Sequence, residues 1–444
     1  MRPVIALLSL LVASTAFGEV EPPPPVALPD MVTLEDALKI FRQRGYDLLI
    51  ADAAVYGAEG DLKVAGAVPN PSWSLDGNYS FAYGAGNHGI CGPGSGANCS
   101  PWGVTATLSD SNALEDTLSG KRGLRLRVAR AALAAIKLNR ADTQRTLEFQ
   151  VKQQYIQAVQ ARDSLDFALE VQKSSNQTFE LTKLRYEKGA ISEADEAKIE
   201  TTKLEADQAV DTAAQQLRGA KVGLAFLLGV RGSIPDFKVE PDLPKFSVPP
   251  RLTTATPTSL YDEAIKTRPD LRALQAQRDR AQASLALAKR LLFPDLNINL
   301  GYSQQTGTDS LAAQPPTLSF GLGGTLPIFY FQGGEIRKAE ADARTQKLQL
   351  AKQEAQVVSD IESAYNNFAG TRRLVERMQA RLLERATRAR DLVGIQYQKG
   401  SASLLELLDA QRQYIATNLE YLQDLANYWT AVFQLEQAVG TDLR

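Results

Sequence analysis

The sequence has very few side chains that bind metal ions or act with a nucleophile. Its 444 residues include one histidine, His88, and two cysteines, Cys91 and Cys99. A structural zinc site takes about four ligands, mostly Cys and His, and hydrolytic triads rely on a histidine base. The composition argues against a His- or Cys-based metalloenzyme and against any triad that does not use His88. We expect no catalytic residue, no metal ion and no cofactor.

An excess of charge of one sign is also missing, as are long apolar runs. Lys and Arg number 49 against 51 Asp and Glu, so the formal net charge is −2. Nucleic-acid-binding proteins show a basic excess, and we expect no nucleic acid as a partner. After the N-terminal segment, no apolar run approaches the roughly 20 residues that a membrane-spanning helix needs.

The N-terminal segment is typical of an export signal. Arg2 precedes an apolar run over residues 4–13, and small residues follow. A charged start, an apolar core and small residues before the cleavage point predict a signal peptide over residues 1–18. A buried strand or a membrane anchor is the alternative. Residues 19–32 are Pro-rich and are expected to form an extended leader.

Export makes a disulfide possible. Cys91 and Cys99 lie in a Gly-, Pro- and Ser-rich segment, residues 84–101. Cysteine pairs of exported chains commonly form disulfides, so a disulfide within this loop is predicted. Two free thiols are the alternative.

The two halves of the chain repeat one another. Tyr186 and Gly189 recur as Tyr397 and Gly400, 211 residues later. Self-similarity at a fixed offset indicates structural repeats. A second set of matches has an offset of 223 residues and links the fronts of the halves: Asp47 with Asp270, Pro71 with Pro294, and Tyr79 with Tyr302.

Two structural repeats are therefore predicted, residues 33–233 and 259–444, with a Pro-rich linker at 234–258 between them. In each repeat the hydrophobic pattern predicts a helix, a β-hairpin, a very long helix and a last helix. These elements are expected at 33–67, 71–110, 121–188 and 192–229 in the first repeat, and at 259–292, 295–327, 334–399 and 403–439 in the second.

The long helices determine the expected fold class. Each lacks proline over about 66 to 68 residues and, at about 1.5 Å per residue, would be roughly 100 Å long. No single globular core is that deep, so such helices must pack side by side as coiled coil. Positions of the last helix from Leu405 to Phe433 recur at alternating spacings of three and four and are apolar except at Arg412, which fits this packing. We expect a mainly α protein with a small β part.

The predicted strands alternate between apolar and polar residues. Trp73, Leu75 and Tyr79 share one face, whereas Ser74 and Asp76 share the other. Runs of about 9 to 12 residues with this alternation suit tilted transmembrane strands, although ordinary hairpins packed on the helices are the alternative. Four strands cannot close a barrel, and lipid tolerates no open sheet edge. A membrane-spanning sheet therefore predicts oligomerisation, and three copies would supply twelve strands.

These features resemble the outer-membrane efflux protein family, the TolC-like channels. The resemblance rests on the duplicated helix–hairpin–helix order, on the tip motifs RYEKGAISEADEAKIET and QYQKGSASLLELLDAQRQY, and on LPIFYFQGGEIRKAEADA at 326–343. SGKRGLRLRVARAA at 119–132 is similar to the heavy-metal branch. The resemblance implies a homotrimer with a twelve-stranded barrel in outer-membrane lipid and a periplasmic α-barrel of coiled-coil helices. It also implies two partners, a periplasmic adaptor (membrane fusion protein) and an inner-membrane pump.

The same resemblance implies a gate at the periplasmic tip. Glu406 and Asp409 are three residues apart, so both lie near one helix face, and acidic residues at these motif positions form the family's selective constriction. Asp195 matches Glu406 in the first repeat and, with Tyr397, is similar to the pair that latches neighbouring tip helices. Ala402 stands where a gate arginine can occur, which departs from the pattern. The alternative for each acid is a solvated helix face.

Tyr186, Gly189, Tyr397 and Gly400 are similar to the family's tip contacts for adaptor hairpins. Their alternative is turn chemistry, in which glycine supplies a positive φ. The leading hypothesis is a passive outer-membrane exit duct of a tripartite efflux system, carrying small solutes, drugs or metal ions. A periplasmic coiled-coil scaffold without channel activity is the alternative. The sequence does not identify the cargo, the partner pump and adaptor, or the resting state of the gate.

Overall fold

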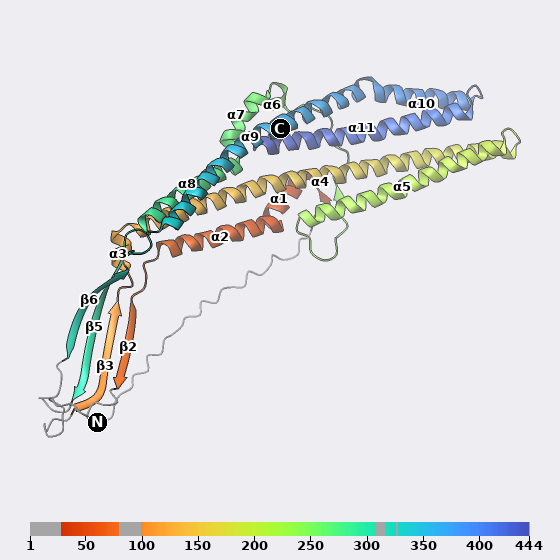
Figure 1. Ribbon diagram of the computed structural model, residues 1–444. Helices are drawn as coiled ribbons and strands as arrows, with labels where there is room; N and C mark the ends of the chain where they lie inside the picture. Colours follow the sequence, from red (N-terminus) through yellow and green to blue (C-terminus); the bar gives the residue numbers. More distant parts are fainter. Residues whose placement is uncertain (1–27, 80–98, 308–315, 326, 444) are drawn as a thin grey trace.

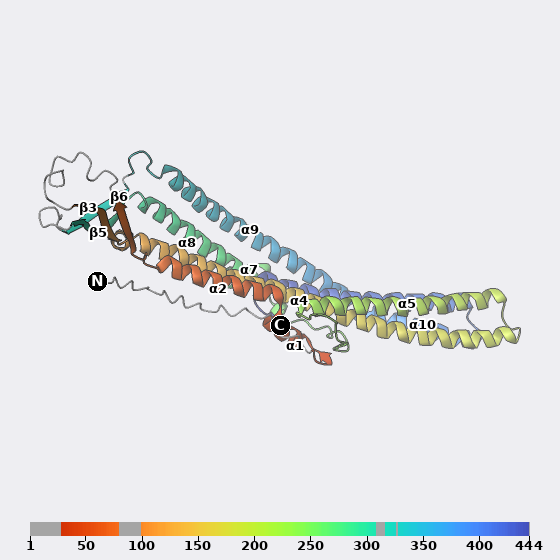
Figure 2. The same ribbon diagram turned by 90° about the horizontal axis from the view of Figure 1, so that it is seen from below.

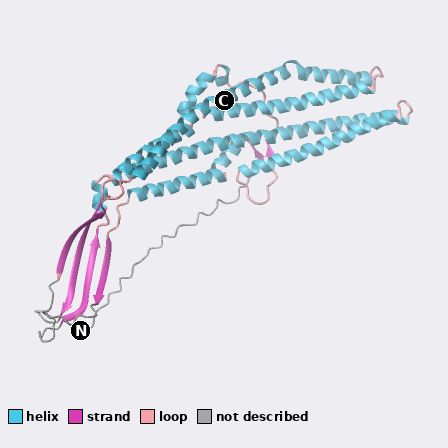
Figure 3. Cartoon of the chain, in the orientation of Figure 1, coloured by secondary structure: helices cyan, strands magenta, loops and turns pink. Residues whose placement is uncertain are grey.

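The computed structural model describes residues 28–79, 99–307, 316–325 and 327–443. The molecule is elongated, with a small β-sheet at one end and two helical hairpins at the other (Figure 1). Figure 3 shows that helices make up most of the chain. The expected fold class, mainly α with a small β part, is confirmed. The predicted signal peptide and most of the leader lie outside the described residues.

Four strands form one antiparallel sheet in the order β2-β3-β5-β6. Each predicted hairpin pairs its own two strands, and β3 pairs with β5 to join the two repeats. The edge strands β2 and β6 have no further partner strand in the described part of the chain. The strands are β2 (Ser72–Tyr79), β3 (Cys99–Ser109), β5 (Asp295–Gly307) and β6 (Thr317–Thr325).

The sheet has one apolar face and one polar face. The register places Trp73, Leu108, Leu300 and Phe320 in one row across all four strands. All four side chains are exposed, Trp73 by 77% and Phe320 by 78%. On the other face, a matching row consists of polar residues: Asp76, Thr105, Ser303 and Thr317. None of the described helices therefore covers the apolar face.

The helices next to the sheet lie side by side in the same order as the strands. α2 (Tyr46–Gly66) contacts α4 (Lys121–Glu187), α4 contacts α8 (Pro269–Arg290), and α8 contacts α9 (Gly333–Arg377). Figure 2 shows these helices running away from the sheet. Each adjoins one strand along the chain, so the strand order and the helix order correspond. A short helix, α3 (Ala113–Leu118), lies between β3 and α4.

The first helix of each repeat is broken in two, which corrects the expectation of one helix over 33–67 and one over 259–292. In the first repeat, α1 (Leu34–Arg44) precedes α2. In the second repeat, α7 (Pro257–Thr267) precedes α8.

The two breaks have nearly the same backbone geometry. They occur at Gly45 (φ −59°, ψ 120°) and at Arg268 (φ −62°, ψ 120°), which the 223-residue offset also relates. Pro269 explains the second break, because the residue before a proline is disfavoured in the α region. At Gly45, a Cβ atom would lie 2.5 Å from the Phe41 ring, so only glycine fits this bend without a shift.

Beyond this layer the chain forms two long hairpins. The end of α4 packs on α5 (Glu193–Leu227), α10 (Leu383–Gln398) packs on α11 (Leu404–Val439), and α11 also contacts α4. A π-helical turn, Met378–Leu382, separates α9 from α10. The helix expected over 334–399 is therefore not regular throughout, and a π turn is a known cause of helix bending.

The Pro-rich linker packs along the middle of the helices. We call residues 237–249 the linker strap. Its strand β4 (Lys238–Val239) pairs in parallel with β1 (Met31–Val32). Phe237 and Leu243 are buried, and burial of each such side chain contributes about 1.5–3 kcal/mol. Packing therefore holds the linker against the helices.

Polar bonds to both repeats also hold the linker strap. Trp429 of α11 donates its Nε1–H to the Pro244 carbonyl at 2.8 Å. The Leu243 N–H donates to the Asp163 carboxylate of α4 at 2.7 Å. The strap thus joins α4 of the first repeat to α11 of the second, and helix α6 (Pro250–Thr253) follows it.

Candidate functional site at the helical tips

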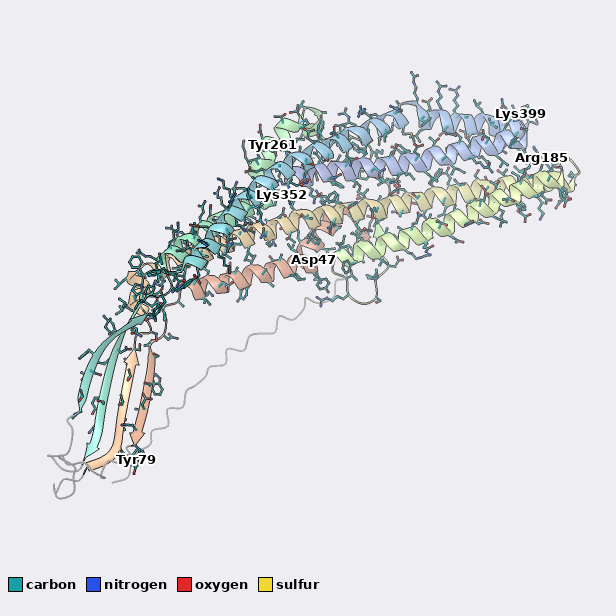
Figure 4. The ribbon with its side chains drawn as sticks, in the orientation of Figure 1. Asp47, Tyr79, Arg185, Tyr261, Lys352 and Lys399 are labelled. Carbon is teal, nitrogen blue, oxygen red and sulfur yellow. The ribbon has the colours of Figure 1, made fainter. Side chains whose placement is uncertain are left out.

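The two tip turns share one geometry. Gly189, after α4, has a φ of +70°, and Gly400, after α10, has a φ of +78°. In each turn the glycine N–H and the next N–H donate to carbonyls of the preceding helix at 2.8–3.0 Å. This arrangement ends a helix and favours glycine at the positive φ. Figure 4 places Arg185 and Lys399, beside these turns, at the end of the molecule opposite to Tyr79 of the sheet.

Glu406 forms part of the cap of α11. Its carboxylate accepts hydrogen bonds from the Ser403 N–H at 2.7 Å and from the Ser403 hydroxyl at 2.9 Å. The Glu406 N–H donates to the Ser403 hydroxyl in return, at 3.3 Å, which completes a capping box. The bonds from Ser403, first from its backbone and then from its side chain, hold the pKa of Glu406 below its ordinary value. Glu406 is therefore ionised at neutral pH.

Asp195 has the corresponding position at the start of α5. Its carboxylate accepts a hydrogen bond from the Ser192 hydroxyl at 2.9 Å, and Lys198 Nζ lies 3.8 Å away. Within the part of the chain that the structure describes, Asp195 and Tyr397 form no hydrogen bond with each other. The spacing Ser-x-x-Asp/Glu at both tips is itself a cap signal, and it could have identified this second role of the two acids.

Asp409 lies on the exposed side of α11. Leu407 and Leu408, which precede it, are buried at 5% and 6% exposure. Glu406 and Asp409 are both exposed. The two carboxylates that the sequence pairs are therefore together on the side of α11 that faces away from the packed hairpin.

Arg185, the first residue of the tip motif RYEKGAISEADEAKIET, joins the tips of the two hairpins, a role that the motif does not indicate. Its guanidinium lies 5.1 Å from the ring centre of Tyr397, and its Nη2 donates to the Gln398 carbonyl at 3.2 Å. Tyr397 is partly covered by this contact, whereas the neighbouring Tyr186 is exposed. The structure thus places Tyr397 against α4, and it leaves the side chain of Tyr186 accessible.

Two cavities lie between the hairpins. One of about 400 Å³ is lined by α4, α5, α11 and Arg390 of α10. The other, of about 450 Å³, is lined by α4, α10 and α11 and includes Arg185 and Tyr397. Well-packed protein interiors contain few voids larger than a water molecule. The hairpins therefore leave open space between them here, in contrast to the region of the linker strap, where Tyr428 is fully buried.

Cys99 is the first residue of β3, but Cys91 and the predicted disulfide lie outside the described residues. No group of three or more His, Cys, Asp or Glu side chains among the described residues is arranged to hold a metal ion. Across the same residues, no helix combines the length and the apolar character needed to cross a membrane.

Comparison with known proteins gives consistent matches along the chain. A family model described as outer membrane efflux protein matches residues 37–230 and 260–441. The pyoverdine export outer membrane protein OpmQ of Pseudomonas putida is 25% identical over 388 residues, which cover 85% of this chain and 79% of OpmQ. The cobalt-zinc-cadmium resistance protein CzcC of Cupriavidus metallidurans is 22% identical over 416 residues, which cover 92% of this chain and 90% of CzcC. The crystal structure of CusC matches with a TM-score of 0.74 at 18% identity. The match covers 95% of this chain and 97% of the CusC chain.

Proposed function

Because the chain belongs to the outer membrane efflux protein family, we propose that it forms the exit duct of a tripartite efflux system. The protein is an outer-membrane protein that extends into the periplasm. In the proposal, three copies form the duct, which works with a periplasmic adaptor and an inner-membrane pump. Transport through it is passive and involves no catalytic residue.

The amphipathic sheet with two open edges is the observation that carries the proposal. Its apolar row, which includes Trp73 and Phe320, is exposed, and a face of this kind is stable against lipid. Unpaired edges are not tolerated in lipid. Pairing of β2 of one copy with β6 of the next would remove both edges, and three copies would close a ring of twelve strands.

The polar face of the sheet suits a passage of low selectivity. In the described strands it carries small polar residues and glycine, with Asp76 and Asp295 as its charged side chains. Asp295 is paired with Lys121 at 2.6 Å. Selectivity in channels comes from constrictions lined by charges or carbonyls, so we place it elsewhere along the duct.

We place the constriction at Glu406 and Asp409. Three copies would bring six carboxylates around the axis, and the lowered pKa of Glu406 keeps its part of that ring ionised. Acidic rings favour cations. Arg185 supports this placement because it holds α10 against α4 and thereby opposes widening of the tip. An arginine can occur in the family at the position of Ala402, and in this chain Arg185 on α4 would supply the cation in its place.

The adaptor is proposed to contact the two tip turns through Tyr186, Gly189, Tyr397 and Gly400. These turns lie at the end of the molecule farthest from the sheet (Figure 4), where a periplasmic partner has access. The cargo class is proposed to be small solutes, drugs or metal ions. OpmQ is named for pyoverdine export and CzcC for cobalt, zinc and cadmium resistance, so the pump is expected to choose the cargo.

Single-channel recording in a planar bilayer tests the proposal. The mature wild-type protein should give a cation-selective conductance. We expect the double variant Glu406→Gln/Asp409→Asn to lose that selectivity, measured as a reversal potential moving toward zero in a salt gradient. Glutamine preserves the capping box, so a loss of selectivity would report the charge and not the fold of α11.

The matched control is Glu187→Gln/Glu193→Gln, which removes two exposed carboxylates at the other tip. It should keep the wild-type reversal potential. Selectivity that survives Glu406→Gln/Asp409→Asn would place the constriction elsewhere in the duct. Failure of folded wild-type protein to conduct would contradict the duct itself and favour a periplasmic scaffold.

A further inference from the structure

We propose that the corner between β6 and α9, residues 327–335, binds phospholipid headgroups and anchors the duct at the periplasmic surface of the outer membrane. We call these residues the β6–α9 corner. The inference rests on the proposed duct, and it adds a lipid-binding site and its position. The occupant is a glycerophospholipid of the periplasmic leaflet, contacted at the boundary between its headgroup and its acyl chains.

Four consecutive large apolar side chains of the β6–α9 corner are exposed. Ile328, Phe329, Tyr330 and Phe331 are exposed by 64%, 99%, 53% and 64%. Single exposed apolar residues are common, but a contiguous exposed group marks a binding surface. Phe329 touches almost nothing within the chain, so the structure leaves its ring for an external partner.

The corner continues the apolar face of the sheet. Leu318, Phe320 and Leu322 of β6 are exposed by 57%, 78% and 73%, and the strand leads directly into the corner. Family membership places these strands in the outer membrane. The corner is therefore at the depth where the strand leaves the lipid and the helix begins, and aromatic residues concentrate at this interface.

Local bonds hold the corner in one shape. The Tyr330 hydroxyl donates to the Glu335 carboxylate at 2.6 Å and accepts a hydrogen bond from the Gly334 N–H at 2.9 Å. These bonds turn Tyr330 back onto the start of α9. Its polar end is thereby satisfied, while Phe329 and Phe331 remain outside the contact.

Two cations follow the aromatic group at a spacing that suits a headgroup. Arg337 and Lys338 are exposed, and neither has an ion-pair partner within 4.0 Å among the described residues. Arg337 lies four residues beyond Gly333, about 6 Å along the helix at 1.5 Å per residue. The headgroup layer of one leaflet is about 5–7 Å thick. Aromatic rings at the acyl boundary would therefore place these cations beside lipid phosphates.

The equivalent corner of the first repeat is built differently. There, Lys121 pairs with Glu115 at 3.0 Å and with Asp295 at 2.6 Å, and Arg125 pairs with Asp116 at 2.5 Å. Lys121 and Arg125 are thus bound by the chain's own carboxylates, and this corner carries no aromatic group. Each copy should therefore have one lipid anchor, at the β6–α9 corner.

Tryptophan quenching by brominated phosphatidylcholine tests the inference in vesicles reconstituted with the full-length mature protein. The variant Phe329→Trp changes a side chain that is 99% exposed, so folding should be unaffected. We expect its additional emission, relative to wild type, to be quenched in brominated vesicles. The matched control is Leu348→Trp, which is on α9 and 62% exposed, roughly 22 Å beyond Gly333. It should not be quenched.

The wild-type protein reports insertion independently, because Trp73 and Trp102 lie on the exposed apolar face of the sheet. Absence of quenching in wild type would contradict the membrane-inserted sheet, and the inference with it. If the wild-type tryptophans are quenched but the tryptophan at position 329 is not, the lipid anchor is overturned and the membrane-inserted sheet is retained. In that case, blue-shifted emission from position 329 in detergent-solubilised trimer would assign the corner to a contact with a second copy.

The role of the cations needs a second lipid mixture. Brominated phosphatidylglycerol, diluted in unbrominated phosphatidylcholine, should quench the tryptophan at position 329 at least twofold more than the same fraction of brominated phosphatidylcholine. Arg337→Gln/Lys338→Gln should abolish that preference. Equal quenching by both brominated lipids would contradict the phosphate contact.

Discussion

Arg185 on α4 reaches across to α10, where its guanidinium lies 5.1 Å from the ring centre of Tyr397. This contact and the bond to the Gln398 carbonyl join the tips of two hairpins that also meet farther along, where Phe167 of α4 contacts Tyr414 of α11. We therefore expect the pair to limit how far apart the tips can move.

Arg185→Ala should favour the open tip. An exposed cation–π contact contributes about 0.5–1 kcal/mol, and the hydrogen bond adds a similar amount. Loss of about 1–2 kcal/mol corresponds to roughly 5–30-fold in an equilibrium, which open probability in planar bilayers would measure. Lys183→Ala, which removes an exposed cation of the same helix, is the control. Equal open probability in Arg185→Ala and wild type would contradict the latch.

Asp163 should make the linker strap sensitive to pH. Burial raises the pKa of Asp163 to about 6, against the opposing effect of the Leu243 N–H, and Asp242 and Asp166 add repulsion. A carboxyl group whose pKa is higher in the folded state than in the unfolded state stabilises the fold fully when the pH is below the unfolded-state pKa. This stabilisation is lost as the pH rises through the folded-state pKa. The strap should therefore be held more weakly at pH 7 than at pH 5, by about 1–2 kcal/mol after solvent screening.

Limited proteolysis of the strap measures this effect. Cleavage should be faster at pH 7 than at pH 5 after correction for protease activity. Asp163→Asn should remove the difference and slow cleavage at pH 7, whereas Asp166→Asn, an exposed neighbour, should retain most of it. If the wild-type strap is cleaved more slowly at pH 7 than at pH 5, the predicted direction of the pH effect is wrong.

Arg268→Ala should be strongly destabilising. Arg268 is 3% exposed and bonds to Asp270 at 2.6 Å, to Asp360 at 3.2 Å and to the Ala438 carbonyl at 3.0 Å. Burial alone would raise the pKa of Asp270, but the bonds from Arg268 bring it below its ordinary value. Removing one partner of a buried pair costs about 3–5 kcal/mol. Thermal unfolding should show this, and the exposed Arg272→Ala should leave the transition nearly unchanged.

Gly229→Ala and Gly232→Ala form a matched pair. Both positions have a positive φ, +75° and +77°, which costs a non-glycine residue about 1–2 kcal/mol. Only at Gly229 would a Cβ also meet protein, 2.5 Å from the Arg44 carbonyl oxygen. Overpacking at Gly229→Ala should therefore reduce the free energy of unfolding by about 1–3 kcal/mol more. Its melting temperature should be the lower of the two. Equal losses would contradict the close approach.

The duplication, readable from the sequence, anticipates much of the fold. The 223-residue offset relates the helix breaks at Gly45 and Arg268, and the 211-residue offset relates Gly229 to Gly440. The breaks themselves depend on contacts between distant segments. Gly229 approaches Arg44, and a Cβ at Gly440 would lie 3.4 Å from Arg268 Cα. Local sequence preference identifies the break before Pro269 but cannot detect these distant contacts, so the sequence alone predicts one helix over 33–67.

The tip site shows the same division. Motif spacing singles out Glu406 and Asp195, and the structure adds that each bonds to the serine that caps its helix, Ser403 or Ser192. Arg185 could not be found this way, because its position against Tyr397 depends on how α4 and α10 lie next to each other. The linker strap likewise depends on tertiary contacts, since Trp429 and Pro244 are distant in sequence.

The matching order of strands and helices has a genetic consequence in the proposed trimer. Because each strand adjoins one helix and the order never changes, one copy would form a complete lengthwise sector of the wall, from the outer-membrane sheet to the periplasmic tip. A chain with a damaged tip would still contribute its strands to a closed ring. Such a chain would enter assemblies with wild-type chains and impair them, so alleles that damage only the tip should be dominant.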